Sequence, residues 1–207
     1  MLSDDEPMAV PLWIDGHAFL TMAPAFRDVC NPFNGAVLRR TPMCDADTVR
    51  QAVSVAQSAL ASWAALPGEA RTALLAALGE ALASYGAHFA GLVGEESGLD
   101  SITATAEIEA SVALLQNTAG AGAPAVLGVV GNSTSPLLGV LRLAAPALSA
   151  GAVVVVRPNP QTPSALFALA ELTGRCGFPD GVFNIVHGGD AVVAGLRAVP
   201  GLSLLFS

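Results

Sequence analysis

The sequence VLGVVGNSTSPLLGVLRLAAPALSAGAVVVVRP runs from Val126 to Pro158 and places a helical pattern between two short apolar runs. Val126–Val130 and Val153–Val156 are apolar throughout, as expected of strands covered on both faces. Pro136–Leu148 has apolar residues at helical spacing, and its proline lies near the start, where helices tolerate it. The stretch predicts a strand, a helix and a second strand, paired in parallel through a right-handed crossover.

The same alternation continues to the end of the sequence. Thr162-Pro163 opens a helix, and Pro179-Asp-Gly181 turns the chain into an apolar strand at Val182–Val186. Asp190 is expected to cap a short helix, and Leu202–Phe206 is expected to form a fourth strand. Strands that alternate with helices in this way predict an α/β fold, a Rossmann-like doubly wound parallel sheet.

The alternation of strand and helix patterns begins near residue 125. We assign residues 126–207 to the Rossmann-like βαβαβαβ half and residues 1–125 to an N-terminal hairpin and helices, together forming one structural domain. Leu12–Phe19 predicts two strands around a turn at Asp15-Gly16, and Val37–Arg40 predicts another strand. An edge hairpin near the N-terminus follows from these signals.

Three helices are expected between the hairpin and the sheet. The first begins at Asp45, a good N-cap, and ends before Pro67-Gly68. The second continues to Gly98, and the third carries Ile108 on its apolar side. Thr118–Pro124 is then a linker or a tight crossing.

Composition excludes several classes of protein. Hydrophobic residues make up 53% and charged residues 13% of the chain, so disorder is not expected. The net charge is −8 and all nine basic residues are arginine, which disfavours nucleic-acid binding. The absence of lysine excludes Schiff-base chemistry by this chain.

Nothing in the sequence predicts a membrane span or a metal site. The acidic start, Met1–Pro7, lacks the positive charge of a signal peptide. The long uncharged stretch between Glu109 and Arg142 is interrupted by amides, glycines and prolines. Cys30, Cys44 and Cys176 are scattered without metal-ligand spacing. We therefore expect a soluble cytoplasmic protein without metal.

Several motifs in linked order resemble the aldehyde dehydrogenase family. The nucleotide-binding core of the family is similar to Leu127–Leu138, Leu143–Pro158, Gln161-Thr-Pro163, Gly177–Val186 and Leu204–Ser207. Its N-terminal hairpin and first helices are similar to Trp13–Gly16, Asn31–Gly35, Trp63 and Glu95–Gly98.

This resemblance implies an NAD(P) domain, a catalytic domain and a β-extension used for oligomerisation. The family uses a cysteine nucleophile, hydride transfer to NAD(P), and a glutamate that activates water. Both residues would lie downstream of this sequence, which ends within the family's Phe-Thr-Gly-Ser motif after Phe206. We therefore expect an incomplete aldehyde dehydrogenase fold that is inactive alone, with NAD or NADP as cofactor. A partner chain with the catalytic domain, or a homo-oligomer, would complete it.

The resemblance also implies which residues face the cofactor. They follow the carboxyl ends of the predicted strands, where open α/β sheets bind ligands. The predicted set is Val130, Gly131, Asn132, Ser133, Arg157, Pro158, Pro160, His187, Gly188, Phe206 and Ser207.

Departures from the family pattern bear on function. Thr134 occupies the position of an oxyanion-binding asparagine, and loss of such a donor costs about 3–4 kcal/mol of transition-state stabilisation. Arg157 replaces a lysine that contacts the adenosine ribose, and Pro160 replaces a glutamate of many NAD-preferring members, which favours NADP. The segment before Val126 is short, which puts the family's oligomerisation hairpin in doubt.

Plainer interpretations remain open for these residues. Thr134 could be a loop hydroxyl that bonds to backbone, Arg157 a solvated charge at a strand end, and His187 part of an ordinary turn. The substitutions also leave open a non-catalytic module that uses this fold to bind another protein.

Overall fold

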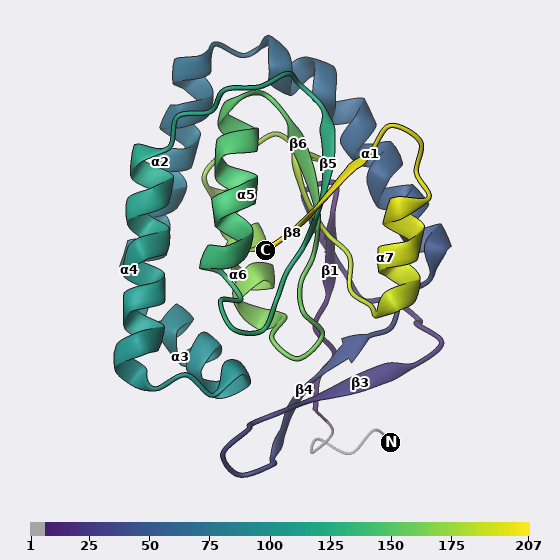
Figure 1. The fold of residues 1–207 in the computed structure, drawn as a ribbon, viewed down its shortest axis with the longest axis vertical. Coiled ribbons are helices and arrows are strands. Elements are labelled where there is room, and N and C mark those ends of the chain that lie inside the picture. Colours follow the sequence, from purple (N-terminus) through teal and green to yellow (C-terminus); the bar gives the residue numbers. More distant parts are fainter. Residues whose placement is uncertain (1–6) are drawn as a thin grey trace.

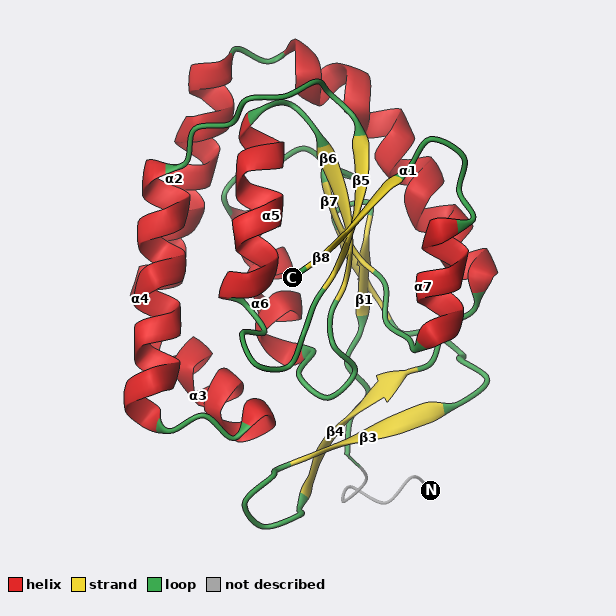
Figure 2. Cartoon of the chain, in the orientation of Figure 1, coloured by secondary structure: helices red, strands yellow, loops and turns green. Residues whose placement is uncertain are grey.

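The computed structural model describes residues 7–207, so the acidic start, Met1–Glu6, lies outside the described residues. A six-stranded sheet forms the centre of the molecule, with helices on both faces (Figures 1 and 2). The order of its strands is β2 (His17–Phe19), β1 (Leu12–Ile14), β7 (Phe183–Ile185), β6 (Val153–Arg157), β5 (Val126–Val130) and β8 (Ser203–Phe206).

The pairing of the strands confirms the predicted fold class. β5 pairs in parallel with β6 and β8, and β6 pairs in parallel with β7. β1 pairs antiparallel with β2 and, through Trp13 and Ile185, with β7. The N-terminal hairpin therefore extends the sheet at one edge, while the division at residue 125 stays a prediction.

Helices form layers on each face of the sheet (Figure 1). One face is covered by α1 (Ala46–Ala65) and α7 (Asp190–Arg197), and the other by α5 (Leu138–Ser149) and α6 (Ser164–Arg175). An outer layer consists of α2 (Gly68–Ser84), α3 (Gly86–Ser97) and α4 (Ser101–Asn117). Every residue of β6 is buried, which explains its continuous run of valines.

A separate two-stranded ribbon was only half predicted. It consists of β3 (Phe26–Cys30) and β4 (Val37–Pro42), and it lies beside the lower ends of the sheet strands in Figure 2. Val37–Arg40 was expected to be a strand, but β3 was not predicted. Three of the five β3 residues are exposed, including Arg27 and Asp28, so β3 lacks the apolar run of a buried strand.

The predicted second helix is wrong in its extent. Instead of running to Gly98 it ends at Ser84, and α3 begins at Gly86. Tyr85 lies between them with φ −108° and ψ 17°, outside the helical region. The apolar spacing continues across the break because both helices bury residues of this pattern, among them Leu82 of α2 and Phe89 of α3.

The segment between α4 and β5 confirms the tight crossing. Gly120 donates its N–H to the Ser149 hydroxyl at 3.0 Å. A Cβ at Gly120 would lie 2.0 Å from the carbonyl oxygen of Pro146, so only glycine fits this close approach.

Candidate functional site

The carboxyl ends of the four parallel strands lie along one edge of the sheet. At the outer side of this edge, the Ser207 N–H donates to the Val130 carbonyl at 3.1 Å. The Ser207 hydroxyl accepts from the Asn132 N–H at 3.1 Å and from its side-chain amide at 3.3 Å. Gly131 donates to the Arg157 carbonyl at 2.8 Å, so predicted residues from β5, β6 and β8 are neighbours.

The loop after β5 is organised by one asparagine. Asn132 Oδ1 accepts from the Thr134 N–H at 2.9 Å and from the Ser135 N–H at 2.8 Å. It also accepts from the Thr134 hydroxyl at 3.0 Å. The Thr134 hydroxyl therefore already donates a hydrogen bond within the loop, which favours the interpretation that it is a loop hydroxyl. The neighbouring Ser133 is exposed.

Arg157 is buried, so the interpretation as a solvated charge at a strand end is wrong. The residue is only 8% exposed, and its Nε donates to the Gly188 carbonyl at 2.8 Å. Burial lowers the pKa of Arg157, the charge of Asp190 raises it, and the charge of Arg27 lowers it further. Neither Nη1 nor Nη2 has a hydrogen-bond partner among residues 7–207. The guanidinium thus keeps donors for a ligand.

His187 does not face the edge with its side chain, and this part of the prediction is wrong. Its ring is fully buried, and Nε2–H donates to the Pro11 carbonyl at 2.9 Å. Burial is the main reason why the pKa of His187 falls to about 4, so the ring is neutral at pH 7. A Cβ at Gly188 would lie 2.4 Å from Val192 Cγ2, so this glycine permits the packing of α7.

The remaining predicted residues are divided between core and surface. Pro158 and Pro160 are buried, and the Pro160 carbonyl accepts from the Thr41 hydroxyl of β4 at 2.8 Å. Phe206 is 55% exposed, with the Arg197 guanidinium 5.9 Å from its ring centroid. Their roles toward a cofactor stay predictions.

Two buried glutamates were missed in the sequence. Glu107 of α4 accepts through Oε1 from the N–H groups of Leu137 and Leu138, at 2.9 and 3.1 Å, and so caps α5. Glu96 of α3 accepts from the Ser164 N–H at 3.1 Å and from its hydroxyl, and so caps α6. Buried carboxylates from the outer helices thus satisfy the free N–H groups of both helix starts.

Glu96 is held in an environment of low polarity. Burial raises the pKa of its carboxyl, although Ser164 and Arg39 both oppose this change. Arg39 Nη1 lies 3.1 Å from Glu96 Oε1 and links α3 to β4. One signal in the sequence could have found these two glutamates. Each lies on the buried side of its helix, one turn after an apolar residue: Val93 before Glu96 and Ala104 before Glu107.

The start of α7 differs from the starts of α5 and α6. Its N-cap is Gly189 rather than the predicted Asp190, and within residues 7–207 no side-chain cap bonds to its first N–H groups. Asp190 is the first helical residue and is exposed. A Cβ at Gly189 would lie 2.9 Å from Met43 Cε. An uncapped helix start favours anions, which the Asp190 carboxylate partly opposes.

Burial disfavours the thiolate form of two of the three cysteines. All three are free, and burial raises the pKa of Cys44 to about 11. Burial also raises the pKa of Cys176. Residues 7–207 contain no cluster of three or more metal-ligating side chains.

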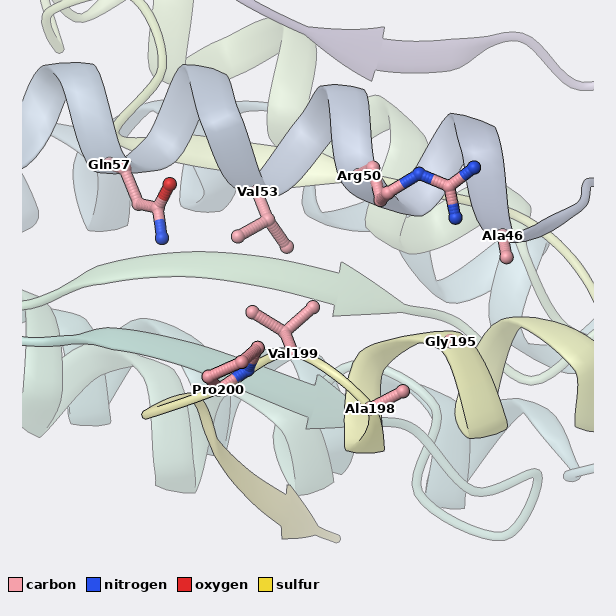
Figure 3. A pocket seen from close by; sticks show the side chains of 8 residues that line it. All are labelled: Ala46, Arg50, Val53, Gln57, Gly195, Ala198, Val199 and Pro200. Atoms are coloured by element: carbon pink, nitrogen blue, oxygen red, sulfur yellow. The ribbon is translucent and has the colours of Figure 1, made fainter.

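A cavity of about 370 Å³ lies between α1 and α7 (Figure 3). Val53 and Val199 face one another across it, and Gln57 and Arg50 lie along the α1 side. Arg50 forms an ion pair with Asp47 of its own helix. The lining contains no acid–base or nucleophile pair, so the carboxyl edge remains the candidate site.

The fold and this edge define a dinucleotide-binding type of α/β protein. The chain belongs to the aldehyde dehydrogenase family, whose model matches residues 21–205. It is 27% identical to lactaldehyde dehydrogenase of Escherichia coli (strain K12), covering 96% of this chain and 46% of that protein. It is 32% identical to succinate-semialdehyde dehydrogenase [NADP(+)] of the same strain, covering 80% and 39%.

A solved structure has the same fold. It is aldehyde dehydrogenase C from Pseudomonas syringae, a mutant in complex with NAD+ and octanal, with a TM-score of 0.84 and 25% identity. That match covers 95% of this chain and 44% of the other. The chain therefore spans less than half the length of these relatives. Among the described residues, no helix has the length and apolar character needed to cross a membrane.

Proposed function

We propose that this chain is the NAD(P)-binding part of an aldehyde dehydrogenase-type oxidoreductase that oxidises an aldehyde to an acid. The cysteine and glutamate of that chemistry would come from outside these 207 residues. The bound dinucleotide would supply the hydride acceptor. A cytoplasmic location remains part of the proposal.

The observation that carries the proposal is the environment of Arg157. Within residues 7–207 the guanidinium of this buried residue uses only Nε; Nη1 and Nη2 have no partner there and are not fully buried, so both can donate to a ligand. They belong to the carboxyl end of β6, next to the uncapped start of α7. A nucleotide phosphate or ribose hydroxyl satisfies such donors, so the residues present fit the cofactor.

Titration calorimetry of the 207-residue chain with NAD and NADP tests the proposal. We expect measurable heat for at least one dinucleotide, and at least tenfold weaker binding by Arg157→Gln. Arg142→Gln removes the same charge from an exposed position on α5 and should bind like the unaltered chain. An absence of heat at millimolar concentration of both dinucleotides would refute the proposal.

The second candidate is a non-catalytic, aldehyde-dehydrogenase-like interaction or structural module that uses this fold to pack against another protein. It is favoured by Thr134, whose hydroxyl is used within its own loop, and by the exposed Phe206 on the edge strand β8. Sedimentation velocity discriminates between the two. A stable monomer that binds NAD or NADP supports the first function and contradicts the second.

A further inference from the structure

A smaller cavity lies between the outer helix α3 and α6, which pack against one another. Its volume is about 150 Å³, enough for a molecule of about six to eight non-hydrogen atoms. Its lining consists of Tyr85, His88 and Phe89 on the α3 side and Ala168, Glu171, Leu172 and Arg175 on α6. None of these residues belongs to the carboxyl edge, so the cavity is a separate candidate site.

Helical spacing brings the lining side chains together. The α6 residues follow one another at i, i+3, i+4 and i+7 from Ala168, which places them on one face of the helix. Tyr85, at the break before α3, begins the same spacing on the other side. Phe89 and Leu172 are buried, whereas Tyr85 is 48% exposed. The cavity therefore has an apolar inner wall and a polar rim.

The polar side chains of this rim have no partners among residues 7–207. Glu171 and Arg175 are four positions apart with the acid first, which is the favourable order for an ion pair on a helix. Nevertheless, neither has an oppositely charged atom within 4 Å in the described part of the chain. The cavity thus offers one negative and one positive group to a ligand.

These two charges define the chemical class of the ligand. A guanidinium such as that of Arg175 binds a carboxylate through two parallel N–H donors, and the carboxylate of Glu171 accepts from an ammonium group. Glu171 would repel a dianion, and Arg175 would repel a dication. A neutral apolar molecule would cover both charges without pairing them. A zwitterion satisfies both groups at once.

We propose that this cavity binds a small apolar α-amino acid. Its carboxylate pairs with Arg175, its ammonium group pairs with Glu171, and its side chain packs against Phe89 and Leu172. The volume of about 150 Å³ limits that side chain to the range from alanine to valine. This site goes beyond the proposed function, since it uses none of the residues assigned to the dinucleotide.

An NMR titration of the full 207-residue chain with L-valine tests the proposal. We expect saturable changes in the amide signals of α3 and α6, with a Kd on the order of 1 mM for a ligand of so few atoms. Isobutylamine is valine without its carboxylate, and 3-methylbutanoate is valine without its ammonium group. Each should bind at least tenfold more weakly than L-valine.

Two variants assign the charges to their partners. Arg175→Gln should remove the advantage of L-valine over isobutylamine, and Glu171→Gln should remove its advantage over 3-methylbutanoate. Arg142→Gln and Glu109→Gln are matched losses of one exposed charge on other helices, and both should bind L-valine within twofold of the unaltered chain. Unchanged thermal midpoints verify that all four variants fold, as expected of substitutions outside the core.

Three results would overturn the amino-acid site. They are an absence of signal changes at about 50 mM L-valine, equal binding of the three compounds, and binding of L-valine that both Arg175→Gln and Glu171→Gln retain. Each of these results would leave the proposed function intact, because the titrations with NAD and NADP test the carboxyl edge separately.

Discussion

Glu107 should be one of the side chains whose loss most weakens this fold. It is 7% exposed, and its Oε1 accepts from two N–H groups in the first turn of α5. Glu107→Ala leaves both donors buried without partners, at about 1–3 kcal/mol each. We take about 3 kcal/mol in total, because water can enter the space left by the side chain. In a chain of this size that lowers Tm by about 6–12 °C.

Glu107→Gln provides a graded comparison. The amide oxygen can still accept, but its hydrogen bonds lack the assistance of a negative charge, so the expected loss is about 1 kcal/mol. Glu109 is exposed on the same helix, and Glu109→Ala should change stability by less than about 0.5 kcal/mol. Scanning calorimetry and urea unfolding measure all three. If Glu107→Ala were as stable as Glu109→Ala, the assignment of Glu107 as the cap of α5 would be wrong.

Three further predictions follow from the carboxyl edge. His187 has its pKa lowered to about 4 from 6.5, so its contribution to stability is complete above pH 6.5 and is lost as the pH falls toward 4, by about 3 kcal/mol. Urea unfolding at successive pH values should show this fall, and His187→Gln should remove it; an unchanged profile would contradict the buried neutral ring. Gly188→Ala should cost more than 2 kcal/mol because its Cβ would overlap a valine of α7, whereas Gly201→Ala, at φ 76° in open space, should cost about 1 kcal/mol. Equal thermal midpoints for these two variants would argue against the overlap. Asp190→Asn should tighten the binding of NAD or NADP by about threefold in calorimetry, since it removes the carboxylate that opposes an anion at the start of α7; weaker binding would place the phosphates elsewhere.

The parallel sheet could be predicted because its strands are buried on both faces. In β5 and β6 the apolar runs have no competing pattern, and proline and glycine mark the connections between them. The break between α2 and α3 could not be read from spacing, since Tyr85 continues the apolar stripe. β3 was missed because exposed charges interrupt its alternation.

The candidate site was predictable in its position but not in the direction of its side chains. Topology alone brings Arg157 and His187 to the same edge, yet Arg157 turns toward Gly188 and His187 turns toward Pro11. Both partners are backbone carbonyls, which have no signature in the sequence. Arg27 is 134 positions before Gln161 in the numbering, and the β3–β4 ribbon brings its guanidinium to the Gln161 side chain.

The position of the β1–β2 hairpin at one edge of the sheet has a consequence for how the chain folds. Trp13 pairs with Ile185, and the Pro11 carbonyl accepts from His187 across 176 positions, so β1 finds one of its partner strands far downstream in the chain. Closure of so long a loop is slow, because its entropy is lost before the contact is gained. Until β7 has been made, β1 cannot pair with the rest of the sheet. During biosynthesis the hairpin should therefore stay undocked from the sheet until β7 has been made.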